Sequence, residues 1–300
     1  MRRRNFLQST VLCAVAVSTT GFIQYNGESY EGDCETTTDV LGPFYRPDAP
    51  LRTNLIIKGA PGQEVILQGR VKHKDCTTPY KNAKVELWHC GADGKYDNTS
   101  TEYQFRATTY CDEQGAYEFQ TILPVPYDVG NGHFRPAHFH LLISAPGYQS
   151  LVTQLYFTGD AYIATDSSSA SPTAKRRILD VKQGAGGKKM VTFDMTMTDK
   201  LSVEPAALEK IVGIYQDEKD KALKTEFFKR DGQLWVKAGE IVYGMGFEYT
   251  GNNTFAQSSR PSGMSRTYIF DIQRDGSVKV THTNVNANGV KTTSVAFKEK

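Results

Sequence analysis

Hydrophobic and polar residues alternate along short stretches of the first half of the chain, which is the pattern of strands with one buried face. Five stretches rich in β-branched and aromatic residues are separated by turn residues: 64–71, 83–90, 115–123, 138–145 and 151–157. Their lengths and spacing favour an antiparallel β-sandwich over a fold that alternates helices with strands. The polar, Ser-rich stretch 164–177 is predicted to be a long loop, and a last strand over 188–198 closes this domain.

The pattern changes once, and then returns to strands. Apolar residues recur at helical spacing over 202–215, where Ser202 is a candidate cap and Pro205 lies in the first turn. Beyond this helix, strand patterns flank two dipeptides that are typical of tight hairpins: Asp231-Gly232 and Asp275-Gly276. Residues 203–300 are therefore predicted to form a smaller, barrel-like β domain, so the whole fold is expected to be all-β.

The N-terminal residues have the pattern of an export signal. Three arginines, at positions 2–4, precede an apolar run of roughly a dozen residues, which is too short to span a bilayer. Residues 3–7 resemble the twin-arginine type of signal, which serves proteins that fold before export. We expect a signal at 1–22, a sandwich domain at 23–202 and an exported product, periplasmic or extracellular, without a stable membrane span. The alternative is a basic end followed by an ordinary buried helix.

Composition changes this picture only at the cysteines. With a net charge of +2 and 39% hydrophobic residues, the chain can bury two cores, and its charge gives no support to a nucleic-acid or membrane-surface partner. Cys13 lies in the expected signal, which leaves four cysteines in the exported chain: Cys34, Cys76, Cys90 and Cys111. They allow up to two disulfides in any of three pairings. A thiolate metal site is less favoured, since no CxxC pair occurs.

Candidate chemistry is concentrated in the segment RPAHFH, residues 135–140. Alternate side chains of a strand project from the same face, about 6–7 Å apart, so His138 and His140 have a spacing that two metal ligands can use. Zinc enzymes, cupin-type sites and plain hydrophobic cores all contain such pairs. No Asp or Glu lies between His140 and Asp160, so the same hairpin offers no carboxylate ligand of the cupin kind.

Two tyrosines are the other candidate ligands. Tyr96 and Tyr127 stand where predicted strands give way to loops. A phenol has a pKa of about 10 and ionises near neutral pH only beside a strong cation. Fe(III) suits two phenolates with two imidazoles better than zinc or copper does, and one added hydroxide makes such a site neutral. Taken alone, each tyrosine is explained equally well as an aromatic residue of a strand start or a turn.

The joint occurrence of several segments, in one order, is more specific than any single residue. Residues 41–50, 85–97, 109–127 and 135–160 together resemble the intradiol ring-cleavage dioxygenases, the catechol and protocatechuate dioxygenase family, over roughly 34–199. The resemblance implies a ferric ion held by four side chains: Tyr96, Tyr127, His138 and His140. It also implies that Arg135 stabilises charge on the substrate, that Gln154 is the active-site glutamine, and that Tyr127 yields to the substrate and offers a base.

The resemblance further implies the reaction. A catechol-type small molecule would be cleaved by O₂ between its two hydroxylated carbons, with both oxygen atoms incorporated. Residues 121–127 and 154–160 favour a protocatechuate-like substrate, and a catechol-like substrate stays open. One point of geometry stands against the simplest picture: strand parity puts Arg135 on the face opposite His138, unless the strand begins only after Pro136.

Two other functions stay open. The chain could be an exported β-sandwich that binds carbohydrate or a partner without catalysis. It could also be a zinc hydrolase that uses the histidine pair, although no third ligand or general base is evident. The remaining histidines, Trp88 and Tyr156 are interpreted as structural. Residues 203–300 show architecture without chemistry and are interpreted as a docking or stabilising domain, and an oligomer is possible.

Overall fold

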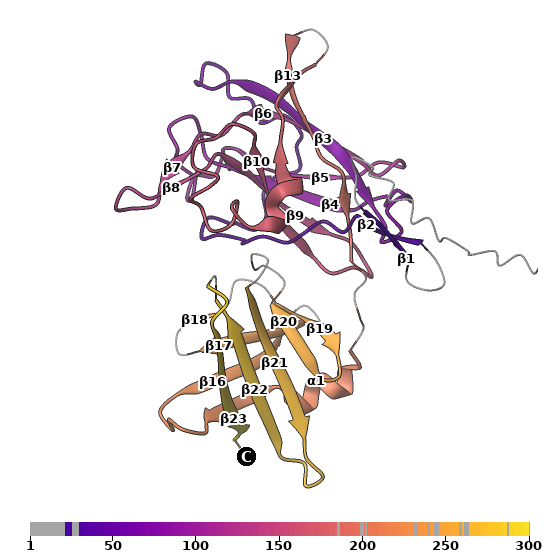
Figure 1. Ribbon diagram of the computed structural model, residues 1–300, viewed down its shortest axis with the longest axis vertical. Coiled ribbons are helices and arrows are strands. Elements are labelled where there is room, and N and C mark those ends of the chain that lie inside the picture. The colour runs from indigo at the N-terminus through magenta and orange to yellow at the C-terminus, as the bar shows by residue number, and fades with distance from the viewer. Residues whose placement is uncertain are drawn as a thin grey trace, which may run out of the picture.

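The described residues form two β-rich bodies that follow one another along the chain (Figure 1). The computed structural model describes residues 22–25, 30–184, 187–198, 201, 203–230, 233–238, 241–242, 246–257, 260, 264–286 and 288–299. The signal expected at 1–22 lies outside the described residues, apart from Phe22. None of the helices in this described part is long and apolar enough to cross a membrane.

The first body is the expected β-sandwich. Its strands are β1 (Phe22–Tyr25), β2 (Tyr30–Asp33), β3 (Glu64–Lys72), β4 (Lys84–Trp88), β5 (Arg106–Tyr110), β6 (Ala116–Ile122), β7 (Tyr127–Asp128), β8 (Phe134–Arg135), β9 (His138–Ser144), β10 (Leu151–Phe157), β11 (Ile178–Leu179), β12 (Lys182–Gln183), β13 (Lys189–Thr192) and β14 (Met195–Thr196). One sheet has the order β11-β10-β9-β4-β5, and the other has the order β12-β13-β3-β14 with β6 paired to β3. The two small ladders β1-β2 and β7-β8 stand apart from these sheets.

The sandwich core lies between the two sheets. Leu67 and Phe119 from the second sheet belong to the same buried cluster as Leu141 and Leu155 from the first. Each is fully buried, and burying a side chain of this size stabilises the fold by roughly 1.5–3 kcal/mol. Because side chains alternate along a strand, the residues between these core positions on β9 and β10 project from the other face of the first sheet.

Three local features differ from the expectations. Strand β5 was not predicted, although it pairs with β4 over its whole length. The Ser-rich stretch ends in a short 3-10 helix, η1 (Pro172–Arg177), and is therefore not entirely loop. The single strand expected over 188–198 is two short strands, because strand pairing is interrupted at Phe193. The carbonyl oxygen of Phe193 packs so close to Gly69 that a Cβ built on Gly69 would lie 1.8 Å from it.

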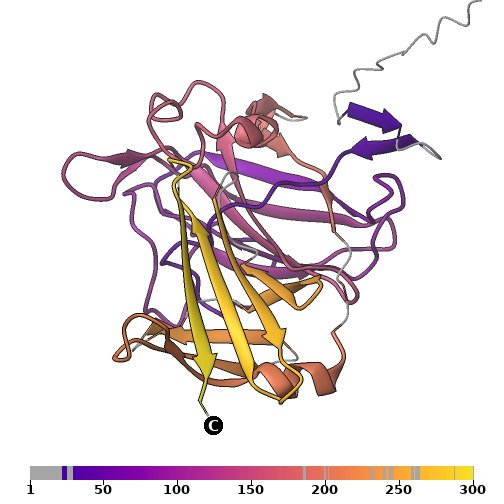
Figure 2. The ribbon, with the colours of Figure 1, turned by 60° about the horizontal axis from the view of Figure 1, so that its bottom comes forward.

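The second body is a closed barrel with one helix. Its elements are α1 (Pro205–Ile211), β15 (Gly213–Asp217), β16 (Lys224–Arg230), β17 (Gln233–Ala238), β18 (Ile241–Val242), β19 (Phe247–Gly251), β20 (Thr254–Gln257), β21 (Ser265–Ile272), β22 (Val278–Val285) and β23 (Lys291–Lys298). In the described residues, pairing of β16 with β17 closes a ring of eight strands, with β18 attached to β17. Figure 2 brings this barrel forward, with β21, β22 and β23 side by side. The all-β fold class is thus confirmed.

The helix and hairpin predictions have mixed outcomes. The N-cap of α1 is Glu204, so the prediction of a cap at Ser202 is wrong, and Ser202 itself lies outside the described residues. Pro205 does occupy the first turn. The Asp275-Gly276 hairpin joins β21 to β22, with Gly276 at a positive φ of 83°. The Asp231-Gly232 dipeptide lies outside the described residues.

One disulfide is present in the described residues, where the sequence allowed up to two. Cys34 and Cys76 form a disulfide with a Cα–Cα distance of 5.9 Å, which ties the start of the sandwich to the β3–β4 connection. Cys90 and Cys111 are buried thiols. Burial raises the pKa of each thiol to about 11, so both stay protonated near neutral pH.

Candidate metal centre

The outer face of the first sheet carries the candidate site. His138 and His140 project from β9, and the ladder places Trp88 of β4 and Gln154 of β10 directly opposite His140, on either side of it. All four side chains are at most 2% exposed. Residues paired across neighbouring strands project from the same face, so this register assembles one buried layer of polar and aromatic groups.

The four predicted ligands come together on this face. The Nε2 atoms of His138 and His140 face each other at 3.1 Å, and the Tyr96 Oη lies 3.4 Å from the Nε2 of His138. The ring of Tyr127 packs edge-on against Tyr96, with centroids 5.5 Å apart, and lies 5.7 Å from the ring of His138. Two phenols and two imidazoles, drawn from separate parts of the chain, therefore converge.

Hydrogen bonding fixes the tautomer of one histidine. The Nδ1 of His138 lies 2.6 Å from the carbonyl oxygen of Pro136, so Nδ1–H donates to it and Nε2 is left with a lone pair. The ring of His140 stacks on Trp88 with centroids 4.8 Å apart, and its buried Nδ1 has no hydrogen-bond partner among the described residues. The two facing Nε2 atoms are thus suited to share a cation.

Burial favours the neutral forms of the two histidines and the two tyrosines of the site when no cation is bound. Burial, assisted by the positive charge of Arg135, lowers the pKa of His138 to about 3, and burial lowers that of His140 well below 6.5. Burial also raises the pKa of Tyr127 and, aided by the neighbouring Tyr127, raises that of Tyr96 well above 10. A metal ion reverses this preference for the phenols, because it stabilises the phenolate directly.

The donor set fits a hard trivalent ion. In the part of the chain that the structure describes, no cluster of three or more His, Cys, Asp or Glu residues is placed to hold a metal. The phenols of Tyr96 and Tyr127 are the oxygen donors that the contacts described above bring to the histidine pair. Phenolate oxygen with imidazole nitrogen is a donor set suited to Fe(III).

Arg135 and Gln154 are also brought to the site. Arg135 lies in β8, where it pairs with Tyr127, and a break at Pro136–Ala137 separates β8 from β9. The backbone N–H of Ala137 donates to Asp160 at 2.8 Å and holds this break. Strand parity therefore does not extend to Arg135, and its Nη2 donates to the Oε1 of Gln154 at 2.8 Å.

Several further residues of the site were not predicted from the sequence. The carboxylate of Asp166 accepts from Nε of Arg135 at 2.7 Å, although it lies in the Ser-rich stretch that was interpreted as loop. Trp88 and Tyr156 were interpreted as core residues. The ring of Trp88 stacks on His140, and the hydroxyl of Tyr156 lies within hydrogen-bonding distance of Gln154. Tyr156 stands two residues after Gln154 on β10, so strand parity could have placed it on the site face.

A covering segment, residues 39–45, closes the site from above the sheet. The ring of Phe44 stacks on Tyr96 with centroids 4.4 Å apart, and Tyr45 packs edge-on against Trp88 at 5.1 Å. The guanidinium of Arg106 donates to the carbonyl oxygen of Phe44 at 2.5 Å. The segment therefore covers the histidine side of the site, where His138 and His140 are buried, whereas Tyr96 and Tyr127 stay partly exposed.

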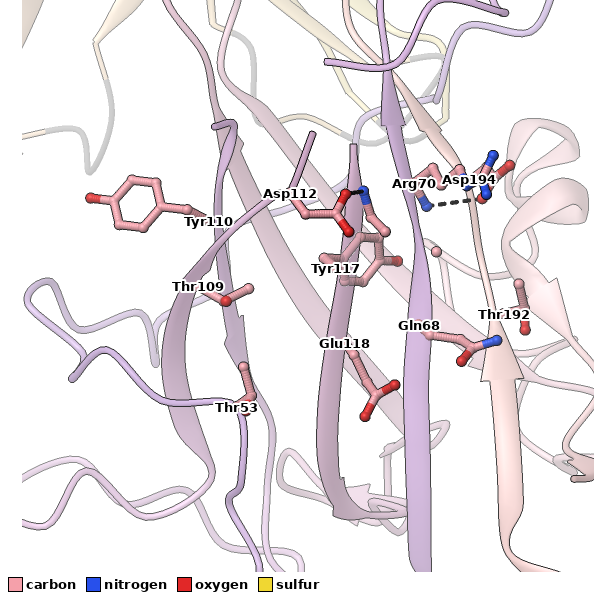
Figure 3. A pocket seen from close by; sticks show the side chains of 12 residues that line it. Thr53, Gln68, Arg70, Thr109, Tyr110, Asp112, Tyr117, Glu118, Thr192 and Asp194 are labelled. Atoms are coloured by element: carbon pink, nitrogen blue, oxygen red, sulfur yellow. Dashed lines mark hydrogen bonds between the residues drawn. The ribbon is translucent and has the colours of Figure 1, made fainter. Parts of the chain in front are cut away.

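A separate hollow of about 530 Å³ is lined by the second sheet and by β5 of the first sheet (Figure 3). Its lining is mainly polar, from β3, β6 and β13 and their surroundings: Thr53, Gln68, Gly69, Arg70, Thr109, Tyr110, Asp112, Ala116, Tyr117, Glu118, Thr192 and Asp194. None of the predicted site residues lines it. The hollow is therefore distinct from the candidate metal centre.

Comparisons with known proteins agree on one group of enzymes. A family model described as Dioxygenase matches residues 40–199. A chlorocatechol 1,2-dioxygenase of Rhodococcus opacus is 35% identical over 158 residues, which are 45% of this chain and 61% of that protein. A 6-chlorohydroxyquinol 1,2-dioxygenase of Cupriavidus pinatubonensis is 33% identical over 221 residues, 67% of this chain and 76% of that protein.

Solved structures agree with the sequence relatives. The catechol 1,2-dioxygenase from Pseudomonas arvilla C-1 superposes with a TM-score of 0.50 at 28% identity, covering 57% of this chain and 64% of that one. This chain spans between 53% and 61% of the length of several of the curated relatives that it matches. The match to the family model ends at residue 199, before the barrel.

Proposed function

This chain belongs to the intradiol ring-cleavage dioxygenases, and from that premise we propose that it cleaves a catechol-type ring between its two hydroxylated carbons with O₂. The observation that carries the proposal is the convergence of Tyr96 and Tyr127 on two imidazole nitrogens that face each other at 3.1 Å. These two tyrosines, with His138 and His140, would hold Fe(III).

The side chains around the proposed ion have distinct tasks. When bound, Fe(III) supplies the Lewis acidity that favours the doubly deprotonated catechol. Tyr127 lies on the short β7-β8 ladder and is only partly buried, so its Oη would be accessible to accept a substrate proton. Arg135 is held by Asp166 and Gln154, and presents a fixed positive charge to the negative charge that develops on the substrate.

The choice of ring is the finer part of the proposal. The relatives described above are named for chlorocatechol, 6-chlorohydroxyquinol and catechol, which supports a catechol-type ring. The preference for a protocatechuate-like ring, drawn from residues 121–127 and 154–160, stays a prediction. Turnover of catechol, hydroxyquinol and protocatechuate by the same preparation compares the three directly.

Export is a second part of the proposal. The twin-arginine-like pattern at 3–7 supports delivery of the folded, metal-loaded protein out of the cytoplasm. The exported protein would then meet an aromatic substrate that arrives from outside the cell. Fractionation of expressing cells tests this. Recovery of processed protein from the cytoplasm alone would count against it.

The metal and the reaction are tested together. We expect purified protein to contain about one iron per chain, to be coloured by tyrosinate bound to Fe(III), and to change its visible band when catechol is added without O₂. Tyr96→Phe should weaken this band strongly, whereas Tyr117→Phe, a buried tyrosine whose hydroxyl donates to Phe193 instead, should leave it unchanged. Folded protein that stays colourless after Fe(III) reconstitution would contradict the proposal.

A further inference from the structure

Arg135 is the proposed electrostatic group of the site, and its orientation depends on more than its two strongest partners. We propose that Tyr156 is a positioning residue, whose hydroxyl is oriented by the buried carboxylate of Asp39 and fixes the guanidinium of Arg135 for the substrate. This inference rests on the proposed function, which it deepens by adding a residue that acts through Arg135.

The hydroxyl of Tyr156 stands where three polar groups meet. Its Oη lies 2.8 Å from Oδ2 of Asp39, 3.0 Å from Oε1 of Gln154 and 3.3 Å from Nη2 of Arg135. A phenol has one proton to donate, and the ionised carboxylate is the stronger acceptor. The Tyr156 proton therefore goes to Asp39, and the oxygen lone pairs are left to accept from Arg135.

Asp39 is itself immobilised. Its Oδ2 also accepts from Nη1 of Arg177 at 2.5 Å, and its Oδ1 accepts from the backbone N–H of Val40 at 2.7 Å. Both members of the Asp39–Arg177 pair have side chains at most 1% exposed. Arg177 is tied down in turn because it donates to the carbonyl oxygen of Gln154 at 2.8 Å. The acceptor that orients Tyr156 is therefore held through both of its carboxylate oxygens.

These contacts leave one part of the guanidinium for the substrate. Nε and Nη2 of Arg135 make the hydrogen bonds to Asp166, Gln154 and Tyr156, whereas Nη1 makes none within the described residues. Gln154 cannot replace Tyr156 by shifting, because its own Nε2 donates to the carbonyl oxygen of Val40 at 2.7 Å. The Tyr156 hydroxyl is thus the third point that determines the orientation of the guanidinium plane.

The first test compares two buried tyrosines in the iron-loaded, full-length enzyme. We expect Tyr156→Phe to lower kcat/KM for catechol about tenfold, the effect of losing one hydrogen bond to a charged group. The control Tyr117→Phe removes a hydroxyl that donates to Phe193 at 2.7 Å, away from the site, and should leave kcat/KM unchanged. Neither variant should alter the visible spectrum, since neither residue is a proposed ligand.

A double-mutant cycle separates positioning from a general structural role. In an Arg135→Gln background, Tyr156→Phe should lower kcat/KM by less than about twofold, because the group through which it acts has been removed. A second, full tenfold loss in that background would overturn the proposal.

A third measurement needs no activity and no metal. In ¹⁵N NMR spectra of the metal-free protein, the Nη2–H signal of Arg135, which comes from the group that donates to Tyr156 and is identified by its loss in Arg135→Lys, should exchange with water at least tenfold faster in Tyr156→Phe than in wild type or Tyr117→Phe. Unchanged exchange would refute the positioning role even if Arg135→Gln proves inactive. Absence of ring cleavage by wild type would instead refute the proposed function and leave this readout intact.

Discussion

At the scale of single residues, the site depends on a position that has no side chain. Gly42 lies in the covering segment at a φ of 74°, and a Cβ built there would stand 3.2 Å from Cε1 of His140. The left-handed backbone conformation is tolerated best by glycine, and an added Cβ would crowd the ring of a proposed metal ligand. Gly42 therefore combines a conformational and a packing requirement.

Gly42→Ala should separate these two requirements when it is compared with Gly59→Ala. Gly59 has a similar φ of 80°, but no atom of the described residues lies within 4 Å of a Cβ built there. Both variants should lose about 1–2 kcal/mol of unfolding free energy from the positive φ. Only Gly42→Ala should also displace His140, and so shift the visible band and speed iron loss to a chelator. Equal iron retention in the two variants would argue against the contact.

The proposed ligands were predicted from the sequence, but Asp39 and Asp166, which hold the neighbouring side chains, were not. Tyr96 and His138 stand within local segments with a distinctive order, so a linear pattern is enough to find them. Asp39 and Asp166 meet the site only because two loops fold back onto the first sheet, and the contacts that they make span 138 and 31 positions. No local periodicity encodes such contacts.

At the scale of elements, the strands with alternating patterns were the predictable ones. Strand β5 was missed because three of its five residues, Arg106, Thr108 and Thr109, are polar yet buried. Their burial follows from contacts outside the strand: the hydroxyl of Thr108, for example, donates to the carbonyl oxygen of Ala49 at 2.8 Å. The break between β8 and β9, which brings Arg135 to the site, depends on the distant carboxylate of Asp160.

The Cys34–Cys76 disulfide gives a prediction at this scale. It joins residues 42 positions apart, and closing a loop of this length restricts the unfolded chain. Replacing both cysteines by serine should therefore lower the unfolding free energy by about 2–4 kcal/mol, as measured by urea denaturation. The visible spectrum of the folded variant should not change, because no proposed ligand lies in that connection.

A matched measurement excludes a simple effect of thiol removal. Cys111→Ser replaces a buried thiol that forms no disulfide in the described residues. Reducing agent should therefore lower the unfolding free energy of this variant by the same amount as that of the wild-type protein. Wild-type protein treated with reducing agent should approach the stability of the double serine variant. Insensitivity of the wild-type protein to reduction would contradict a stabilising disulfide.

At the scale of the whole molecule, the two bodies have separate cores. The buried cluster of the sandwich and that of the barrel share no residue. The sequence predicted β structure in both bodies, but closure of the barrel needs the pairing of β15 with β23, in which Tyr215 lies opposite Lys298. That pairing joins the two ends of the body, which hairpin signals alone do not specify, and it completes the barrel-like form expected for residues 203–300.

The separate cores predict that the sandwich works without the barrel. A protein that ends at residue 202 should fold, bind iron and keep its turnover within a few-fold of the full chain. One hydrogen bond between the two bodies lies close to the site: the hydroxyl of Thr38 donates to the carbonyl oxygen of Arg260 at 3.1 Å. Thr38 precedes Asp39, which accepts from the hydroxyl of Tyr156. Thr38→Val in the full chain removes this hydrogen bond while keeping the barrel, so it should reproduce any small loss of kcat/KM in the truncated protein. A folded truncated protein that cannot bind iron would instead make the barrel part of the metal centre.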